Sequence, residues 1–136
     1  MATSTMLQFP IWATGRRKES TARVRLIKGQ GKLVINDKSM EDFFGGHFRA
    51  KWQVMRPFEV AKVGGQYDIF IDVVGGGVTG QAGAVSHGLA RAFGKLDNGL
   101  RVAMRKEGLM TRDDRMVERK KSGQPKARKR FQYSKR

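Results

Sequence analysis

The last 18 residues of the chain, RKKSGQPKARKRFQYSKR, contain nine lysines or arginines and no acidic side chain. Like charges repel one another along such a segment, and it has few apolar residues with which to build a core. The preceding 118 residues carry 19 basic and 12 acidic side chains. The sequence therefore predicts one folded body, about the size of an ordinary domain, followed by a basic extension.

The net charge of +16 destabilises a compact chain by self-repulsion unless a polyanion neutralises it. An anionic membrane is a poor candidate. No apolar run approaches the roughly 20 residues that cross a bilayer, and no basic amphipathic helix carries aromatics on one face. We therefore expect nucleic acid as the partner and no membrane. The absence of cysteine excludes disulfides, thiolate catalysis and cysteine zinc sites.

The first residues, MATSTMLQFPIWATGRR, lack the basic start, long apolar stretch and cleavage site of a secretory signal. We expect a cytoplasmic protein with three parts. Residues 1–13 are predicted to form an N-terminal extension, residues 14–111 a globular α+β domain, and residues 112–136 an extended basic tail.

Apolar and basic side chains alternate over residues 20–26, which predicts a half-buried strand. Glycines follow it and a short apolar run returns, so a β-hairpin is predicted over residues 20–37. A short helix is expected after Ser39, a favourable N-cap residue with Asp42 three positions later, and before Gly45.

The next helix is predicted to begin near Phe48, with Trp52 and Met55 at helical spacing, and to stop at Pro57. The sequence YDIFIDVV, residues 67–74, is the clearest strand in the chain. A helix over residues 80–96 follows, with a continuous apolar stripe. A last helix over residues 98–107 is predicted to end with Gly108 at its C′ position. This order indicates an α+β fold or a small α/β sandwich with the helices on one side.

The stretch DVVGGGVTGQAG connects a strand to a helix through Gly75, Gly76 and Gly77. Three interpretations fit it: a tight turn that needs positive φ, a contact with nucleic-acid phosphate, or a nucleotide site. The third lacks the Lys-Ser/Thr pair of a P-loop, and the glycine spacing alone does not make a dinucleotide fingerprint.

Candidates for catalysis or metal binding are weak. His47 and His87 are forty positions apart, with no cysteine or nearby acid that completes a metal site. Asp68 and Asp72 share a strand face but lie too far apart for an acid–base pair. We expect no enzymatic activity, no metal, no cofactor and no small-molecule substrate.

Two basic regions favour nucleic acid. In GRRKESTARVR, residues 15–25, a basic run continues along the outward face of the first strand; a plain solvated run is the alternative. In the tail, Phe131 and Tyr133 alternate with cations, which suits stacking on nucleotides, whereas a merely solubilising tail is the alternative. The tail cations fall into two clusters, residues 119–121 and 128–130.

Five stretches in a fixed order resemble the family of small-subunit ribosomal protein nine, of bacterial or organellar type. They are TGRRKESTARVRL (14–26), GKLVINDKSMEDFF (31–44), DVVGGGVTGQAGAVSHGLARAF (72–93), GLMTRDDRMVERKK (108–121) and ARKRFQYSKR (127–136). The resemblance implies a two-layer α+β sandwich with a four-stranded sheet, helices on one face and a left-handed βαβ crossover. That fold occurs in a domain of ribosomal protein five. We expect the crossover to run from the strand over residues 67–74 through the helix after Gly80.

The resemblance also implies a structural protein in the head of the small ribosomal subunit. Its partners would be small-subunit ribosomal RNA, neighbouring ribosomal proteins and peptidyl-site tRNA. The residues predicted to bind rRNA are Arg16, Arg17, Lys18, Arg23, Arg25, Gly75, Gly76, Gly77, Gln81, Arg112, Arg115, Arg119, Lys120, Lys121, Lys126, Arg128, Lys129 and Arg130. The terminal Ser134, Lys135 and Arg136 are expected to contact the anticodon stem-loop of the tRNA. A free-standing basic nucleic-acid binder and a small nucleotide-using enzyme are the alternatives.

Overall fold

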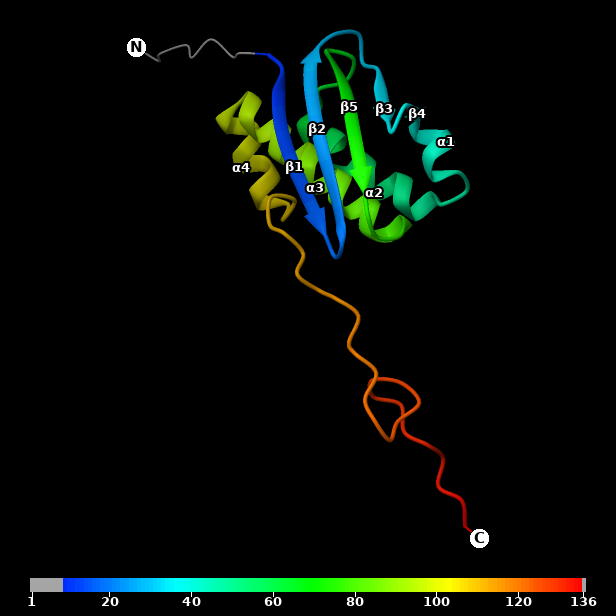
Figure 1. The fold of residues 1–136 in the computed structure, drawn as a ribbon. Coiled ribbons are helices and arrows are strands. Elements are labelled where there is room, and N and C mark those ends of the chain that lie inside the picture. Colours follow the sequence, from blue (N-terminus) through cyan, green and yellow to red (C-terminus); the bar gives the residue numbers. More distant parts are fainter. Residues whose placement is uncertain (1–8, 136) are drawn as a thin grey trace.

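The computed structural model describes residues 9–135 and has an open, five-stranded mixed sheet with its helices behind it (Figure 1). The strand order is β1-β2-β5-β3-β4. The elements are β1 (Ile11–Arg17), β2 (Ser20–Lys28), β3 (Leu33–Ile35), β4 (Lys38–Ser39), α1 (Met40–Phe44), α2 (Phe48–Ala61), β5 (Tyr67–Val74), α3 (Val78–Leu96) and α4 (Asn98–Lys106). The predicted α+β class is confirmed. The resemblance implied a four-stranded sheet, whereas the structure has five strands. The additional strand, β4, has only two residues, and no sequence pattern predicts so short a strand.

The predicted hairpin over residues 20–37 is wrong, because β2 does not pair with β3. Instead β2 pairs antiparallel with β1 through a tight turn at Lys18 and Glu19, and with β5 on its other side. The predicted alternation itself is confirmed, since Ala22, Val24 and Leu26 of β2 are fully buried. Strand β1 begins at Ile11, so the folded body starts within the stretch that the sequence assigned to an N-terminal extension.

Strand β5 lies in the middle of the sheet and also pairs in parallel with β3. The side chain of Asn36 extends this parallel ladder: its Nδ2 donates to the Val73 carbonyl at 2.9 Å, and its Oδ1 accepts from the Val73 N–H at 2.8 Å. The crossover between parallel strands therefore runs from β3 through α1 and α2 to β5. The predicted crossover after β5 is wrong, because no strand follows α3 in the described residues.

Helix α1 begins as predicted, with the Ser39 Oγ accepting a hydrogen bond from the Asp42 N–H at 3.1 Å. Helix α2 differs from its prediction, because it continues past Pro57 to Ala61. Pro57 is buried, and so is Ala61 one turn later. We attribute the continuation to this burial, which offsets the backbone hydrogen bond that the proline cannot donate.

Helix α3 packs directly on β1 and β2 and is buried on almost every side. The approach is closest at Gly15 of β1 and Gly88 of α3. A Cβ at Gly15 would lie 2.0 Å from the Ala84 carbonyl oxygen and 2.2 Å from the Gly88 nitrogen. This contact fixes the position of β1, which continues into the basic residues that follow Gly15. None of the helices in residues 9–135 is long and apolar enough to cross a bilayer.

Helix α4 ends as predicted, with Gly108 at positive φ. The Leu109 N–H donates to the Met104 carbonyl and the Gly108 N–H to the Arg105 carbonyl, which is a Schellman motif. From Leu109 to Lys135 the described chain forms no helix or strand. It runs away from the body as a tail (Figure 1).

Candidate nucleic-acid interface

The structure brings together two basic segments that lie almost 100 residues apart in the sequence. The Asp113 carboxylate, at the root of the tail, accepts hydrogen bonds from Arg115 at 2.8–3.2 Å and pairs with Arg17 of β1 at 3.4 Å. Arg112 Nη2 lies 3.5 Å from the Lys18 carbonyl in the β1–β2 turn. These bonds dock the tail root on the turn. We call Arg17, Lys18, Arg112, Asp113 and Arg115 the root cluster.

The root cluster keeps a positive excess. The hydrogen bonds from Arg115 hold the pKa of Asp113 well below its usual range, so this carboxylate stays charged. Arg16, Arg17, Arg56 and Arg115 line a cavity of about 280 Å³ beside it. Within the described chain, the buried Nε of Arg17 has no hydrogen-bond partner. The root cluster contains four cations and one carboxylate, so a net positive charge remains to attract an anion.

His87 of α3 joins the edge of β1 to the tail root. The Arg16 N–H donates to its Nδ1 at 3.2 Å, so the neutral ring carries its proton on Nε2, which lies 3.3 Å from the Met110 carbonyl. One and two turns later, Arg91 and Lys95 donate to the Thr14 and Trp12 carbonyls. The three α3 side chains thus cover the free edge of β1 and protect it from pairing with another strand.

The contacts of His87 predict a pH dependence of stability. Burial lowers the pKa of His87 below its ordinary 6.5, and the positive charges of Arg91 and Arg112 lower it further. The unfolded chain then binds this proton more readily than the folded one. The contribution of His87 to stability is therefore fully present above the pKa of the unfolded chain. It is lost as the pH falls from that pKa toward the lower pKa of the folded chain. We expect the free energy of unfolding in urea to fall between about pH 7.5 and 5.5.

Substitution of His87→Gln should flatten this pH dependence, since glutamine does not titrate. His47, at the N-cap of α2, gives the matched control: His47→Gln should keep the full slope. Equal slopes in the parent protein and the H87Q variant would show that His87 does not carry the effect.

The basic residues Arg23 and Arg25 do not join the root cluster. Both alternate with buried residues of β2, so they point to the side of the sheet opposite the core. The helices lie on the other side of the sheet (Figure 1). The Arg25 guanidinium lies 4.8 Å from the centre of the Phe70 ring and 5.9 Å from that of Trp12. The predicted basic strand face is thus confirmed as a surface of cations and aromatic rings.

Backbone geometry explains two of the three glycines in the turn between β5 and α3. Gly75 and Gly76 have φ of 76° and 66°, and a Cβ on Gly76 would lie 2.1 Å from the Ser20 Oγ. The Ser20 Oγ and the Gln81 Nε2 both donate to the Gly75 carbonyl. Gly77 has neither constraint. The tight-turn interpretation is confirmed for Gly75 and Gly76, and a phosphate contact there stays a prediction.

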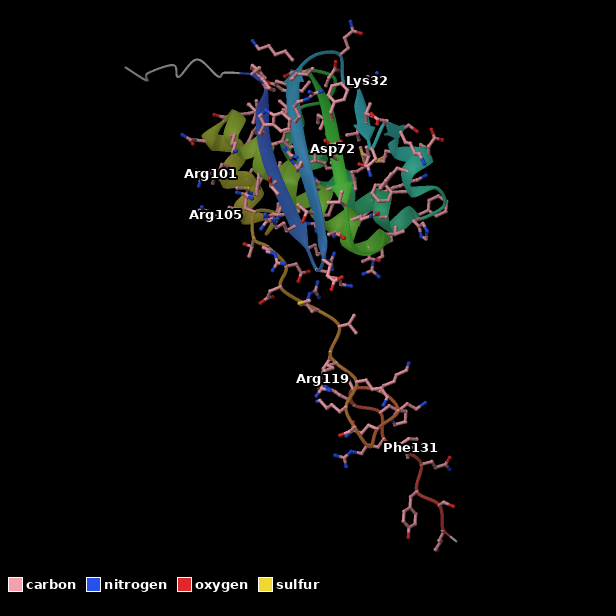
Figure 2. All side chains as sticks on the ribbon, viewed as in Figure 1. Lys32, Asp72, Arg101, Arg105, Arg119 and Phe131 are labelled. Atoms are coloured by element: carbon pink, nitrogen blue, oxygen red, sulfur yellow. The ribbon has the colours of Figure 1, made fainter. Side chains whose placement is uncertain are left out.

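The tail carries its predicted cations on an exposed chain, and Figure 2 shows Arg119 and Phe131 well away from the body. The Glu118 carboxylate accepts from Lys121 at 2.8 Å and from Arg128 at 2.9 Å, which draws the two basic clusters together. Both bonds lower the pKa of Glu118. Of the predicted terminal contacts, Ser134 and Lys135 are exposed, and Arg136 lies outside the described residues.

Asp68, one of the two carboxylates considered for catalysis, has a structural role. Asp68 Oδ1 accepts three backbone N–H groups of the β2–β3 loop, from Gln30, Gly31 and Lys32, at 2.9–3.0 Å. These bonds lower the pKa of Asp68 and make it a loop anchor. Within residues 9–135 no group of three or more acidic, histidine or cysteine side chains could hold a metal ion.

Residues 15–136 match the family model described as ribosomal protein S9/S16. The match covers β1 from Gly15 onward, the other strands, the helices of the described chain and the basic tail. The chain belongs to the ribosomal protein S9/S16 family.

Membership in the ribosomal protein S9/S16 family confirms the predicted resemblance and implies a structural role in the ribosome. It also implies binding to ribosomal RNA and contact with other ribosomal proteins. The role of the family is structural and not enzymatic. A nucleic-acid partner thus follows from the family as well as from the charge.

In this S9/S16 family member, the sequence missed a basic stripe on α4. Arg101 and Arg105 are exposed one turn apart and lie along the outer side of that helix in Figure 2, whereas Met104 is fully buried. Their spacing of four residues is visible in the sequence, but only the burial of Met104 shows that they share the solvent side. The roles of Arg91 and Lys95 at the β1 edge could not be found, because they depend on how α3 lies on β1.

Proposed function

We propose that this chain is a structural protein of the head of the small ribosomal subunit, in the cytoplasm. Its body binds small-subunit rRNA beside neighbouring ribosomal proteins, and its tail reaches the anticodon stem-loop of peptidyl-site tRNA. The observation that carries this proposal is the separation of charge in the molecule. The tail extends away from the body (Figure 1), and its last 18 residues carry nine cations and no acidic side chain.

The body residues proposed to contact rRNA form two surfaces and a turn. The first surface is the basic part of the root cluster together with Arg16, the second is the pair Arg23 and Arg25, and the turn is Gly75 to Gly77 with Gln81. In the tail, the Glu118 carboxylate pairs with both Lys121 and Arg128, so these two cations exchange it for phosphates on binding. Phosphate contacts of this kind add affinity without reading sequence.

The tail is long enough to serve two partners. Its last 18 residues can span up to about 60 Å when extended. Cations near the root would then hold rRNA while the terminal residues reach another molecule. Contacts to phosphate suit a site that accepts every tRNA, because the backbone is common to all of them. Ordering the tail costs entropy, so we expect it to become fixed only on RNA.

We also propose that the body has the fold implied by the resemblance, with a left-handed crossover. This is supported by the path of the chain in Figure 1, where β3 and β5 both run downward. Between them the chain passes behind the sheet through α2 and moves from right to left. Such crossovers are rare, since connections between parallel strands are right-handed in about 98% of cases.

Deletion of Ser134, Lys135 and Arg136 tests the tRNA contact. Loss of one or two charged hydrogen bonds predicts about a tenfold weaker affinity of tRNA for the peptidyl site. Binding of radiolabelled tRNA to subunits reconstituted with the truncated protein measures this. Subunit assembly, followed by sedimentation, should be largely unchanged because the remaining basic residues are intact.

A matched control is the double substitution of Lys126 and Lys129 by alanine, which removes two tail cations but leaves the terminus in place. It should weaken incorporation into subunits more than it weakens tRNA binding. Unchanged tRNA affinity in the terminal deletion would refute the tRNA contact and leave rRNA binding standing.

A further inference from the structure

The side of the sheet opposite the helices is uncovered and carries an ordered row of side chains. Strand register places Trp12 opposite Arg25, and Arg25 opposite Phe70, across β1, β2 and β5. In antiparallel pairs such direct neighbours lie about 5 Å apart at Cβ. All three point away from the core, because the residues on either side of each in its strand are buried. We call Trp12, Arg25 and Phe70 the sheet-face row.

Arg25 in this row and Arg23 beside it lie against aromatic rings and form no ion pair with acidic side chains of the described chain. The Arg25 guanidinium lies between the Phe70 and Trp12 rings, at 4.8 and 5.9 Å from their centres, and that of Arg23 lies 5.9 Å from the Trp12 centre. Neither arginine forms an ion pair with a residue in the described part of the chain. The buried Nε of Arg25 has no hydrogen-bond partner there either.

Trp12 remains 47% exposed although it touches both guanidinium groups. An exposed indole next to two cations matches the chemistry of an unstacked nucleotide, in which a flat base adjoins a phosphate. Asp72 lies opposite Arg23 in the next row and sits on the same open side in Figure 2. Its carboxylate repels phosphate but accepts the amino and imino protons of bases. The surroundings of the row therefore suit base edges better than a duplex backbone.

We propose that the sheet-face row is a stacking site for an unpaired RNA base, with Arg23 and Arg25 on the flanking phosphates. This rests on the proposed function that the body binds rRNA, and it assigns to the sheet face a single-stranded nucleotide. Trp12 stacks on the base, and the Phe70 ring holds the Arg25 guanidinium in place. Single-stranded RNA is commonly bound in this way, by aromatic side chains on an open sheet.

The chain has two tryptophans, so Trp12 can be observed alone in a full-length Trp52→Phe background. We would titrate this protein with an octauridylate and, separately, with inorganic polyphosphate of similar charge. Both bind the basic tail, but only the RNA has bases. We expect octauridylate to quench the Trp12 fluorescence and polyphosphate to leave it nearly unchanged. Equal responses to the two polyanions would overturn the proposal.

Affinity gives an independent test. One stacked base contributes about 1–3 kcal/mol, so Trp12→Leu should weaken octauridylate binding at least about fivefold and leave polyphosphate binding unchanged. Trp12→Phe should recover most of the loss, and Trp52→Leu is the control for removing an exposed tryptophan elsewhere. Circular dichroism verifies that each variant folds.

Two other outcomes would contradict the stacking site. Unchanged octauridylate affinity in the W12L variant, combined with poorer incorporation into subunits, would assign the sheet face to a neighbouring protein. Unchanged values in both assays would leave the face without a partner. Neither result touches the proposed function, which instead fails if the unmodified protein does not bind rRNA.

Discussion

Truncation of the chain after Glu118 should leave the body folded and remove most of its affinity for rRNA. The deleted segment contains nine of the 28 basic residues and reduces the net charge from +16 to +7. Its described residues, 119–135, contribute no side chain to the core, so we expect the deletion to expose no core surface. A cation that neutralises a phosphate releases counterions, which makes the binding constant depend steeply on salt.

The measurement is the rRNA binding constant as a function of salt concentration. If all nine cations contact phosphates, truncation lowers the slope of log K against log salt by roughly 6 to 8. The full chain should lose about 10³–10⁵ in affinity between 50 and 200 mM salt, and the truncated chain far less. Thermal unfolding of the free protein is the control and should give the same Tm for both. A slope that does not change would mean that the body alone supplies the phosphate contacts.

Two of the deleted cations already have a partner in the free protein, but they can still contribute to this change in slope. Two of the tail cations, Lys121 and Arg128, are paired with Glu118 in the free protein. Exposed pairs of this kind contribute little to stability, so RNA can displace the glutamate at small cost. The value for nine cations is an upper limit for the change in slope, because the measurement counts only those cations that exchange Glu118 or water for phosphate.

Features with a local cause could be predicted from the sequence. Ser39 begins α1 because its hydroxyl satisfies a free N–H three residues later, and Gly108 ends α4 because that position needs positive φ. Strand β5 and the apolar stripe of α3 were found from periodicity alone. In each case, the residues that decide the structure are within one turn or one strand of each other.

Pairings between distant segments were predicted wrongly. The run over residues 33–35 follows β2 closely and looks like its hairpin partner, yet β5 occupies that position in the sheet. Strand β5 has buried residues on one face and offers eight residues for pairing, whereas β3 has three. The longer strand makes the longer ladder with β2. Local patterns cannot show this competition, and they also missed how the burial of Pro57 lets α2 continue.

The candidate site divides in the same way. The basic tail could be predicted because its charge is contiguous. The root cluster could not, because Asp113 meets Arg17 only once the tail root is docked by His87 and by the Schellman turn after α4. The aromatic surroundings of Arg25 were hidden for a similar reason: Trp12 and Phe70 come from two other strands.

Substitution of Gly15→Ala should be among the most destabilising single changes in the body. The added Cβ would lie 2.0 Å from the Ala84 carbonyl oxygen and 2.2 Å from the Gly88 nitrogen. Both are backbone atoms of α3, so no side chain can rotate away, and β1 must separate from the helix. Overpacking typically costs 1–3 kcal/mol, and a backbone clash on this scale should reach about 3 kcal/mol or more. We expect Tm to fall by more than about 10 °C.

Gly64→Ala is the matched control, because a Cβ there meets nothing within 4 Å, and its Tm should stay within a degree or two of the parent value. Gly88→Ala should lie in between, since its added Cβ would lie 2.7 Å from the Val24 Cγ2, a side-chain atom, and 3.1 Å from the nearest backbone atom, the Gly15 nitrogen. The order Gly15, Gly88, Gly64 is therefore the prediction, and a Gly15→Ala protein as stable as the Gly64 variant would contradict it.

The Gly15 substitution should also affect the nucleic-acid interface. Arg16 and Arg17 follow Gly15 directly, so a displaced β1 also moves the arginine that pairs with Asp113. Weaker docking of the tail root should then appear as lost rRNA affinity at temperatures where the variant is still folded.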